Sequence, residues 1–166
     1  TTRRIAVIGG GPAGLSYAAT AAKRGHDVTL FESAARLGGQ FNMARVIPGK
    51  SDYEETIKYY EAQLADLGVT INLGSRATVD QLAEGGFDEV ILATGVTPRQ
   101  LDLEGIDHPS VLSYIDVLQG GAEVGKSVAI MGAGGIGFDV AEFLVASEDH
   151  EENHAAFFKE WGVDTQ

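Results

Sequence analysis

A glycine-rich turn between an apolar strand and a helix lies close to the beginning of this 166-residue chain. Residues 4–8 (RIAVI) form a short apolar run that stops at a glycine, which indicates a buried strand. Apolar side chains recur at helical spacing over residues 12–24, and residues 27–32 (DVTLFE) indicate a second strand. Two strands joined by a helix of this length run parallel, so the segment predicts the start of an α/β fold.

The turn itself has the spacing G-x-G-x-x-G at Gly9, Gly11 and Gly14. One glycine makes a tight turn, one lets the backbone approach a pyrophosphate, and one lets the helix pack on the strand. The helix N-terminus adds unpaired N–H groups and the positive end of its dipole. Glu32 closes the second strand, where a carboxylate can accept hydrogen bonds from a ribose. These features predict a dinucleotide site; the alternative is a purely structural turn with a solvated Glu32.

The rest of residues 1–96 is expected to complete a first, FAD-binding domain. The region 34–50 has the composition of a loop, and a helix should begin near Ser51, where Ser51 and Glu54 form a capping-box pattern. Further along we expect strands at 69–72 and 87–93, with a short helix after Thr78. The predicted fold is a Rossmann-like, doubly wound parallel sheet, followed by a connector over 97–125.

Residues 126–166 repeat the pattern and predict the start of a second, NAD(P)-binding unit. A strand is expected at 127–131, a glycine turn at 132–137 and a helix to about Val145. Two dinucleotides in one chain are typical of a flavin reductase, because hydride must pass from nicotinamide to flavin. Acidic residues 147–153 and a helical-looking end with Phe157, Phe158 and Trp161 follow instead of a second strand. We therefore expect a truncated unit, in which the residue that would distinguish NAD from NADP is not visible. The alternative is a structural repeat that binds no cofactor.

Composition argues against several other functions. The chain has 24 acidic residues against 12 Lys and Arg, so nucleic acid and anionic membranes are unexpected partners. Cysteine is absent, which excludes disulfides, a thiol nucleophile and a Cys-ligated iron–sulfur cluster within this chain. We expect a cytoplasmic setting, since neither a signal peptide nor an apolar run of spanning length is visible. No metal site is predicted from the four histidines His26, His108, His150 and His154.

The motifs together resemble the FAD-binding domain of glutathione-reductase-like flavoproteins. The residues that carry this resemblance are 7–14 (VIGGGPAG) followed by Glu32, then 37–42 (LGGQFN) and 93–95 (ATG). More narrowly, the chain resembles the C-terminal part of the bacterial NADPH-dependent 2,4-dienoyl-CoA reductases. That match rests on residues 47–50 (IPGK), 59–60 (YY), 105–109 (GIDHP), 112–118 (LSYIDVL), 134–139 (GGIGFD) and 160–164 (EWGVD).

The resemblance implies which residues contact FAD. For FAD they are Gly9, Gly11, Pro12, Ala13, Gly14, Glu32, Gly39, Gln40, Lys50, Ala77, Thr94 and Gly95. For NAD or NADP the contacts are predicted from the second G-x-G-x-x-G pattern itself, and they are Gly132, Gly134, Gly135, Ile136 and Gly137. Gln40 could donate a hydrogen bond to the flavin cofactor, Lys50 supplies a cation near phosphate or ribose, and Ala77 offers backbone groups to adenine.

The resemblance also implies a larger parent enzyme with further cofactors. In it, hydride passes from NADPH to FAD, and electrons reach an FMN-bearing barrel through an iron–sulfur cluster to reduce an unsaturated acyl-CoA in fatty acid β-oxidation. Neither the barrel nor cluster ligands lie in this chain, so no catalytic residue is predicted and the isolated chain is expected not to turn over. The alternatives are a relative of trimethylamine and histamine dehydrogenases that holds only an ADP-like moiety, and a non-catalytic nucleotide-binding or interaction module.

Overall fold

The computed structural model describes residues 1–99, 101–146, 158–159 and 161–164. The chain divides into two compact units. Unit 1 contains Thr1–Asn42 and Tyr53–Gln100, and unit 2 contains Met43–Asp52 and Leu101–Gln166. Residues 43–52 therefore group with unit 2, although the sequence placed them inside a first domain of residues 1–96.

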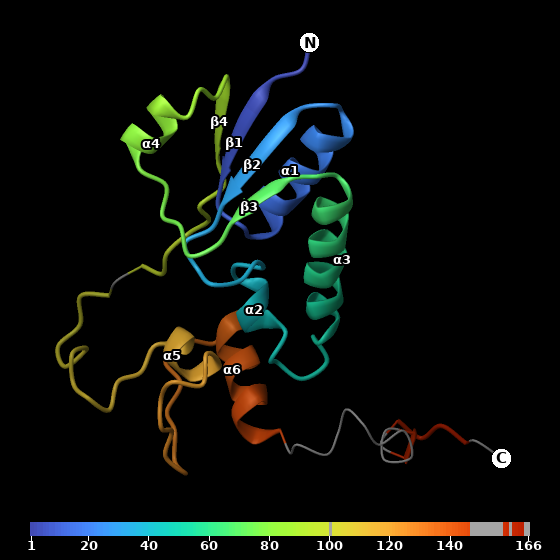
Figure 1. Ribbon diagram of the computed structural model, residues 1–166. Coiled ribbons are helices and arrows are strands. Elements are labelled where there is room, and N and C mark those ends of the chain that lie inside the picture. Colours follow the sequence, from blue (N-terminus) through green and yellow to red (C-terminus); the bar gives the residue numbers. More distant parts are fainter. Residues whose placement is uncertain (100, 147–157, 160, 165–166) are drawn as a thin grey trace. The chain divides into compact units, whose positions relative to one another are not determined.

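Unit 1 is built on a parallel sheet of four strands (Figure 1). The strands are β1 (Arg4–Ile8), β2 (Asp27–Phe31), β3 (Thr70–Asn72) and β4 (Glu89–Leu92), in the order β3-β2-β1-β4. β1 lies between β2 and β4, and all three strand pairs are parallel. The predicted α/β Rossmann-like fold is confirmed, as are the positions of these four strands.

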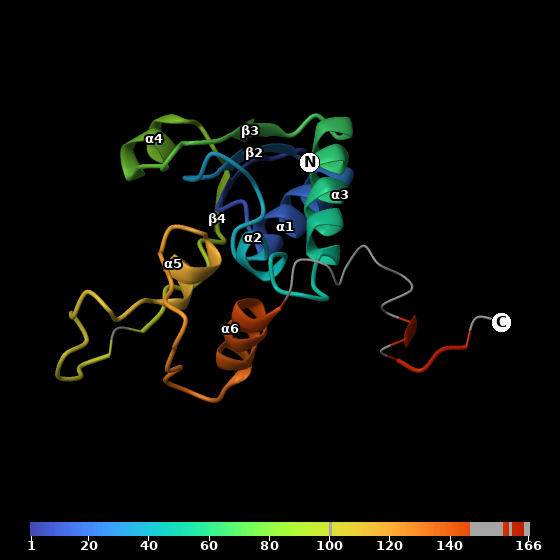
Figure 2. The same ribbon diagram turned by 90° about the horizontal axis from the view of Figure 1, so that it is seen from below.

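Helices α1 (Pro12–Lys23) and α3 (Asp52–Asp66) cover one face of this sheet (Figure 2). α1 buries Leu15, Ala18 and Ala19, whose spacing places them on one side of a helix. From α3, the buried side chains are Ile57 and Leu64, and they join the same apolar cluster. The short helix expected after Thr78 is also present as α4 (Val79–Glu84).

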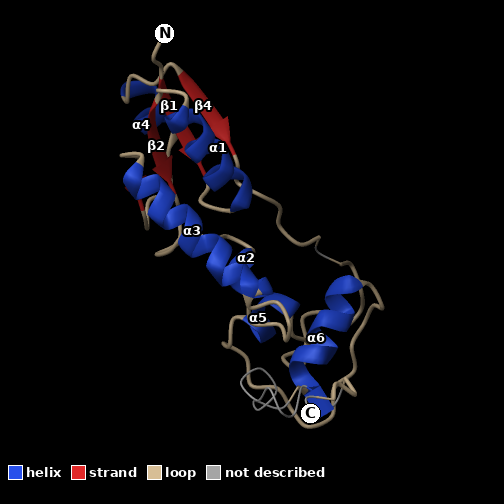
Figure 3. Ribbon diagram, turned by 90° about the vertical axis from the view of Figure 1, so that its right-hand side faces the viewer, coloured by secondary structure: helices blue, strands red, loops and turns tan. Residues whose placement is uncertain are grey.

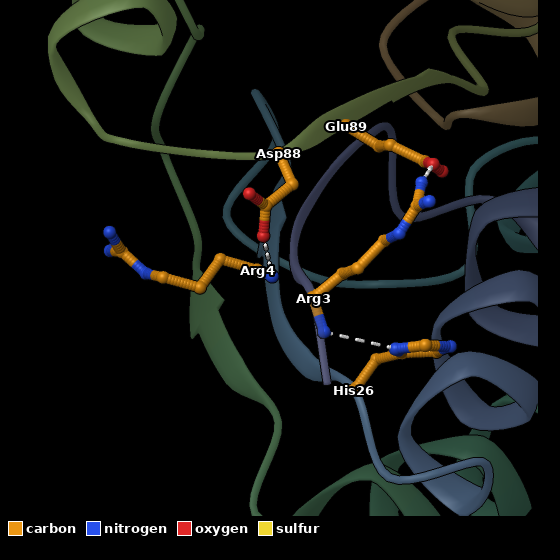
Figure 4. A network of polar contacts seen from close by, with 5 residues as sticks. All are labelled: Arg3, Arg4, His26, Asp88 and Glu89. Carbon is orange, nitrogen blue, oxygen red and sulfur yellow. Dashed lines mark hydrogen bonds and ion pairs between the residues drawn. The ribbon is translucent and has the colours of Figure 1, made fainter. Parts of the chain in front are cut away.

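Polar contacts around the start of β1 connect the amino ends of neighbouring strands (Figure 4). The backbone N–H of Arg3 donates to Nδ1 of His26 at 3.2 Å, and that of Arg4 donates to Oδ2 of Asp88 at 2.7 Å. The Arg3 guanidinium also pairs with the Glu89 carboxylate. These bonds join the start of β1 to residues at or just before the first residues of β2 and β4, and so support the register of the sheet.

Unit 2 has its own small apolar core, with helices α5 (Tyr114–Leu118) and α6 (Gly135–Val145). The buried members of that core are Ile47, Val117, Leu118 and Val140. Figure 3 draws the described strands in red and shows α5 and α6 as helices. The predicted helix that ends near Val145 is therefore confirmed.

Three sequence expectations differ from the structure. Helix α2 (Phe41–Ala44) lies in a region read as loop, and α5 lies in the expected connector. The strand expected at 127–131 is wrong for the described chain, because a strand needs a hydrogen-bonded neighbour and none of the four described strands pairs with it. Its apolar side chains Val128, Ile130 and Met131 are exposed. The expectations for 147–153 and Phe157 lie outside the described residues.

Among the residues that the structure describes, no helix has the length and apolar character needed to cross a membrane.

Replacing a buried and an exposed leucine of the sheet in turn tests which of its two faces contributes to the stability of unit 1. Leu30 is 0% exposed, so Leu30→Ala should lower the free energy of unfolding by about 2–5 kcal/mol through lost burial and a residual cavity. Leu92 is 77% exposed, and Leu92→Ala should change it by less than about 0.5 kcal/mol. Urea unfolding followed by far-UV circular dichroism measures both. Equal losses in the two variants would contradict the described packing.

Candidate functional site

The carboxyl edge of the parallel sheet brings several predicted site residues together. Gly9 follows β1, Glu32 follows β2 and Ala93 follows β4. The Gly9 N–H donates to the carbonyl of Phe31 at 2.8 Å, and the Ala93 N–H donates to that of Ile8 at 2.8 Å. Open α/β sheets bind their ligands at this edge, so the location agrees with a dinucleotide site.

The first glycine turn needs glycine at two positions for internal reasons. Gly9 has φ +112°, and a Cβ there would overlap the carbonyl oxygen of Ala93. A Cβ on Gly14 would overlap the carbonyl oxygen of Gly9. The approach of Gly14 to Gly9 sets helix α1 against the turn that follows β1, as the spacing predicted, and the approach of Gly9 to Ala93 sets that turn against the end of β4.

Gly11 is different, because the fold does not require a glycine there. It is the N-cap of α1 with φ −78°, a conformation open to any residue, and it makes no side-chain cap. A Cβ at this position would find its nearest neighbour, Cα of Gly39, at 3.8 Å, which is ordinary contact. The first turn of α1 carries no acidic residue, and Pro12 occupies its beginning. An open, uncharged helix start is suited to an anionic ligand.

The Glu32 carboxylate is buried and holds the turn in place. Glu32 is 8% exposed, and its Oε2 accepts the backbone N–H of Gly10 at 2.6 Å. Its Oε1 accepts the N–H of Ala34 at 2.7 Å and the hydroxyl of Ser33 at 3.2 Å. Glu32 thus links the turn after β1 to the loop after β2, a structural role that the sequence reasoning missed.

Gly10, which lies inside the predicted 9–14 turn, has a role in the site that the G-x-G-x-x-G pattern does not assign to it. A Cβ there would lie 2.6 Å from Cδ2 of Leu37 and 3.0 Å from Oε2 of Glu32. Glycine at this position lets the glutamate approach the turn. The signal in the sequence was the unbroken run of three glycines at 9–11, which exceeds what the G-x-G-x-x-G pattern requires.

The Gly38–Gln40 loop packs on the first turn. The Gly38 N–H donates to the carbonyl of Gly10 at 2.8 Å. Gly39 has φ +52°, and a Cβ there would lie 2.9 Å from Cα of Gly11. Nε2 of Gln40 donates to the carbonyl of Val96 at 3.3 Å. The structure therefore places Gly39 and Gln40 beside the first turn, in line with the predicted grouping.

Three other predicted residues follow strands at the same edge. Thr94 and Gly95 are exposed just beyond β4, and Ala77 is half-buried in the connection between β3 and α4. That connection is tied to the loop after β2, because the Gly74 N–H donates to the carbonyl of Ala34 at 2.8 Å. Lys50, by contrast, lies in unit 2 and makes its contact there.

The second glycine turn, in unit 2, repeats the geometry of the first. Gly132 has φ +117°, and a Cβ on Gly137 would overlap the carbonyl oxygen of Gly132. Gly134 is the N-cap of α6, with φ −88° and no side-chain cap. A Cβ on Gly134 or Gly135 would meet nothing within 4 Å, and Ile136 is exposed. The missing strand at 127–131 leaves this turn without the neighbours that surround Gly9.

Metal binding finds no support in the described part of the chain. No group of three or more His, Asp or Glu residues there could hold an ion. His150 and His154 lie outside the described residues.

Comparison with known families decides what these two turns belong to. Residues 3–152 match the family described as pyridine nucleotide-disulphide oxidoreductase. The chain belongs to this family. It is an FAD- and NAD(P)-binding domain of the flavoprotein oxidoreductase type.

Several relatives match most of the chain. A cinnamate reductase from Clostridium sporogenes is 43% identical over 142 residues, which cover 86% of this chain and 21% of that protein. The structure of a 2-naphthoyl-CoA reductase complex with 2-naphthoyl-CoA is 35% identical with a TM-score of 0.83, covering 87% of this chain and 22% of that one. The 6-hydroxypseudooxynicotine amine oxidase of Pseudomonas geniculata N1 is also 35% identical, with a TM-score of 0.66, covering 74% and 20%. The chain thus spans about a fifth of the length of these relatives.

Two alanine substitutions in the first turn should differ in their effect on the stability of unit 1. Gly14→Ala should destabilise unit 1 by about 1–3 kcal/mol, because its Cβ would overlap backbone that cannot move away. Gly11→Ala, three residues earlier, should cost less than about 1 kcal/mol, because its Cβ has room and only the preference for glycine over alanine at an N-cap is lost. Urea unfolding compares them. A Gly11→Ala loss as large as that of Gly14→Ala would show that the turn is packed differently.

Removing the charge of Glu32 should weaken the fold as well as any ligand site. In Glu32→Gln one carboxylate oxygen becomes an NH₂ group that faces a backbone N–H, either that of Gly10 or that of Ala34. An unsatisfied buried donor costs about 1–3 kcal/mol, and the midpoint of urea unfolding should fall accordingly. The exposed Glu61→Gln on α3 is the control and should be neutral. A midpoint for Glu32→Gln equal to that of the control would refute the role of Glu32 in holding the turn.

Proposed function

We propose that the chain binds FAD at the first glycine turn and NADPH or NADH at the second, so that hydride can pass between them. The observation that carries the proposal is the open space at Gly11 and at Gly134. Both residues are helix N-caps in an ordinary backbone conformation, so the fold itself does not call for glycine at either position. Glycine there is explained by a diphosphate that must approach the backbone closely.

The residues of unit 1 fit FAD. Backbone N–H groups from Gly11 to Ala13 would receive the diphosphate at the start of α1, and Glu32 would accept a hydroxyl of the adenosine ribose. A carboxylate offers about four acceptor positions, and three are used by Gly10, Ser33 and Ala34. The remaining capacity suits one ribose hydroxyl, and the three bonds orient the carboxylate for it.

The other predicted contacts complete this arrangement at the carboxyl edge. Bound flavin supplies an acceptor for hydride and a donor of electrons, chemistry that side chains lack. The protein's part is to bind and orient it, with Gly39, Gln40, Ala77, Thr94 and Gly95 as the further proposed contacts. In unit 2, Gly132, Gly134, Gly135, Ile136 and Gly137 would hold the nicotinamide dinucleotide, with NADPH preferred because of the resemblance.

We further propose that the parent enzyme resembles the 2,4-dienoyl-CoA reductases. Cinnamate and 2-naphthoyl-CoA, named in two relatives, both have a carbonyl group conjugated to carbon–carbon double bonds, as a dienoyl-CoA has. Because the chain spans about a fifth of these proteins, an FMN-bearing barrel with an iron–sulfur cluster is proposed to lie in other parts of the parent polypeptide. A cytoplasmic setting stays a prediction from the sequence.

An amine dehydrogenase-like parent is the second candidate, because an amine oxidase is among the relatives. Its structure matches less of the chain than the naphthoyl-CoA reductase does, 74% against 87%, and with the lower TM-score. That difference favours the reductase. In the amine-oxidising alternative the first turn would hold an ADP-like moiety, and ADP should then bind as tightly as FAD.

Valine at each N-cap tests the assignment of the two turns. Gly11→Val should weaken FAD binding at least about tenfold, because a side chain would replace the backbone surface that touches phosphate. Gly134→Val should do the same for NADPH. Titrations of the full chain, followed by flavin and nicotinamide fluorescence, measure each affinity. Gly125→Val, in exposed chain with open space around it, is the control.

Measuring the effect of each variant on the other cofactor makes the test specific. Each variant should leave the other cofactor's affinity within about threefold, since the two turns lie in different units. Unchanged FAD affinity in Gly11→Val would overturn the assignment of the first turn.

A further inference from the structure

Two glycines in succession begin the loop that packs on the first glycine turn. Gly38 has φ +113° and Gly39 has φ +52°, which are left-handed backbone conformations. Neither residue has a side chain that could fix the loop, and glycine loses more conformational freedom on ordering than any other residue. The position of the loop must therefore be determined by the groups around it.

The loop lies between the first turn and helix α3. A Cβ on Gly38 would lie 2.6 Å from Cδ1 of Ile57, a buried residue of α3, and a Cβ on Gly39 would lie 2.9 Å from Cα of Gly11. The Gly38 N–H also donates to the carbonyl of Gly10 at 2.8 Å. These contacts place the loop directly against Gly11, so a displacement of the loop would change the space where the diphosphate is proposed to bind.

Asn42, the second residue of α2, bonds to the loop through both its side chain and its backbone. Its Nδ2 donates to the carbonyl of Leu37 at 2.8 Å, and its N–H donates to the carbonyl of Gly39 at 3.1 Å. A Cβ on Gly38 would lie 2.7 Å from the same Nδ2, so the amide also packs against that glycine. Because a carbonyl oxygen only accepts, the amide nitrogen of Asn42 must be the atom that faces Leu37. The side chain therefore holds the residue just before the glycine pair.

Leu37 is itself fixed in the core. It is 3% exposed and belongs to the apolar cluster of unit 1, and its Cδ2 would lie 2.6 Å from a Cβ on Gly10. The Asn42 amide thus connects the glycine pair to a buried residue that lies beside the first turn. The bond is part-buried, so the carbonyl that loses it would not be fully compensated by water.

The loop borders the flavin half of the proposed FAD site. In the strand order β3-β2-β1-β4, the residues after β2 and those after β4 lie on opposite sides of the turn after β1. Glu32, proposed for the adenosine ribose, is on the β2 side, so the flavin half would extend toward the β4 side. Nε2 of Gln40 donates to the carbonyl of Val96, which follows β4, at 3.3 Å. The loop therefore extends from Gly11 toward the side where the flavin is proposed to lie.

We propose that Asn42 is a positioning residue of the FAD site. By holding the Gly38–Gln40 loop against the first turn, it sets Gly39 and Gln40 where the diphosphate and the flavin half would pass. This inference rests on the proposed function of the first turn. It adds a residue that acts through the loop and is distinct from the residues proposed to contact the cofactor.

The test is to titrate the full chain with FAD and, separately, with ADP, which keeps the adenosine half and lacks the flavin. Asn42→Ala should weaken FAD about tenfold, because binding must then order a loop that has lost its side-chain bond. ADP affinity should fall by less than about threefold, because the Glu32 side of the site is unchanged. Gln63→Ala on α3, which removes an amide that donates to the Tyr59 hydroxyl, is the matched control and should change neither affinity.

A second variant removes the donor while keeping the shape of the side chain. Asn42→Asp faces the Leu37 carbonyl with a carboxylate oxygen, which cannot donate, so it should weaken FAD at least as much as Asn42→Ala. FAD affinity equal to that of the original chain would show that the hydrogen bond is not what holds the loop, and would overturn the inference.

Hydrogen–deuterium exchange of the chain without added FAD measures the positioning directly. In both Asn42 variants the amides of residues 37–42 should exchange several-fold faster, while those of residues 4–8 in β1 should be unchanged. Faster exchange in both segments would mean that the substitution destabilises unit 1 as a whole, and the positioning role would be overturned.

The outcomes separate this inference from the function on which it rests. If Asn42→Ala leaves FAD affinity unchanged, or weakens FAD and ADP equally, the inference is overturned while the assignment of the first turn stands. If the original chain fails to bind FAD, or binds ADP as tightly as FAD, the proposed function of the first turn is overturned, and the inference with it.

Discussion

The close approach of one glycine to another's carbonyl oxygen determines the arrangement of both dinucleotide turns. In unit 1 the Gly9 carbonyl occupies the space of a side chain at Gly14, and in unit 2 Gly132 and Gly137 repeat this contact. The contact sets the distance between turn and helix, and with it the direction in which the free N–H groups of the first helical turn point. Everything proposed for the cofactors depends on that direction, since neither turn offers a positively charged side chain of its own.

Glu32 extends this constraint to the rest of the carboxyl edge. Its carboxylate joins Gly10 to the loop after β2, and its backbone carbonyl accepts the N–H of Ser75 after β3. One residue therefore connects three of the loops that follow strands. A buried carboxylate costs free energy unless it is hydrogen-bonded, and here two backbone N–H groups and a hydroxyl occupy three of its acceptor positions. Preorganisation of the site and stability of the fold thus depend on the same side chain.

Local patterns predicted much of unit 1 and less of unit 2, for a physical reason. The strands and the glycine turns follow from short-range periodicity and from conformations that only glycine adopts. The position of Lys50 beside Asp139 depends on a contact between residues 89 positions apart, which no local pattern records. The strand expected at 127–131 has the right composition, but a strand exists only with a partner. The capping box of Ser113 and Asp116 is a local signal for α5. It was missed because residues 97–125 were interpreted as a connector from their overall composition.

The inclusion of residues 43–52 in unit 2 affects how the protein can be divided. These ten residues interrupt the sequence of unit 1, so the polypeptide crosses from one unit to the other three times, after residues 42, 52 and 100. A fragment ending at residue 100 would keep Ile47 but lose Val117, Leu118 and Val140, the other buried residues of its core. Recombination that exchanges the second unit between relatives would likewise have to exchange this insertion. The two units are therefore separate in their cores but not modular at the level of the gene.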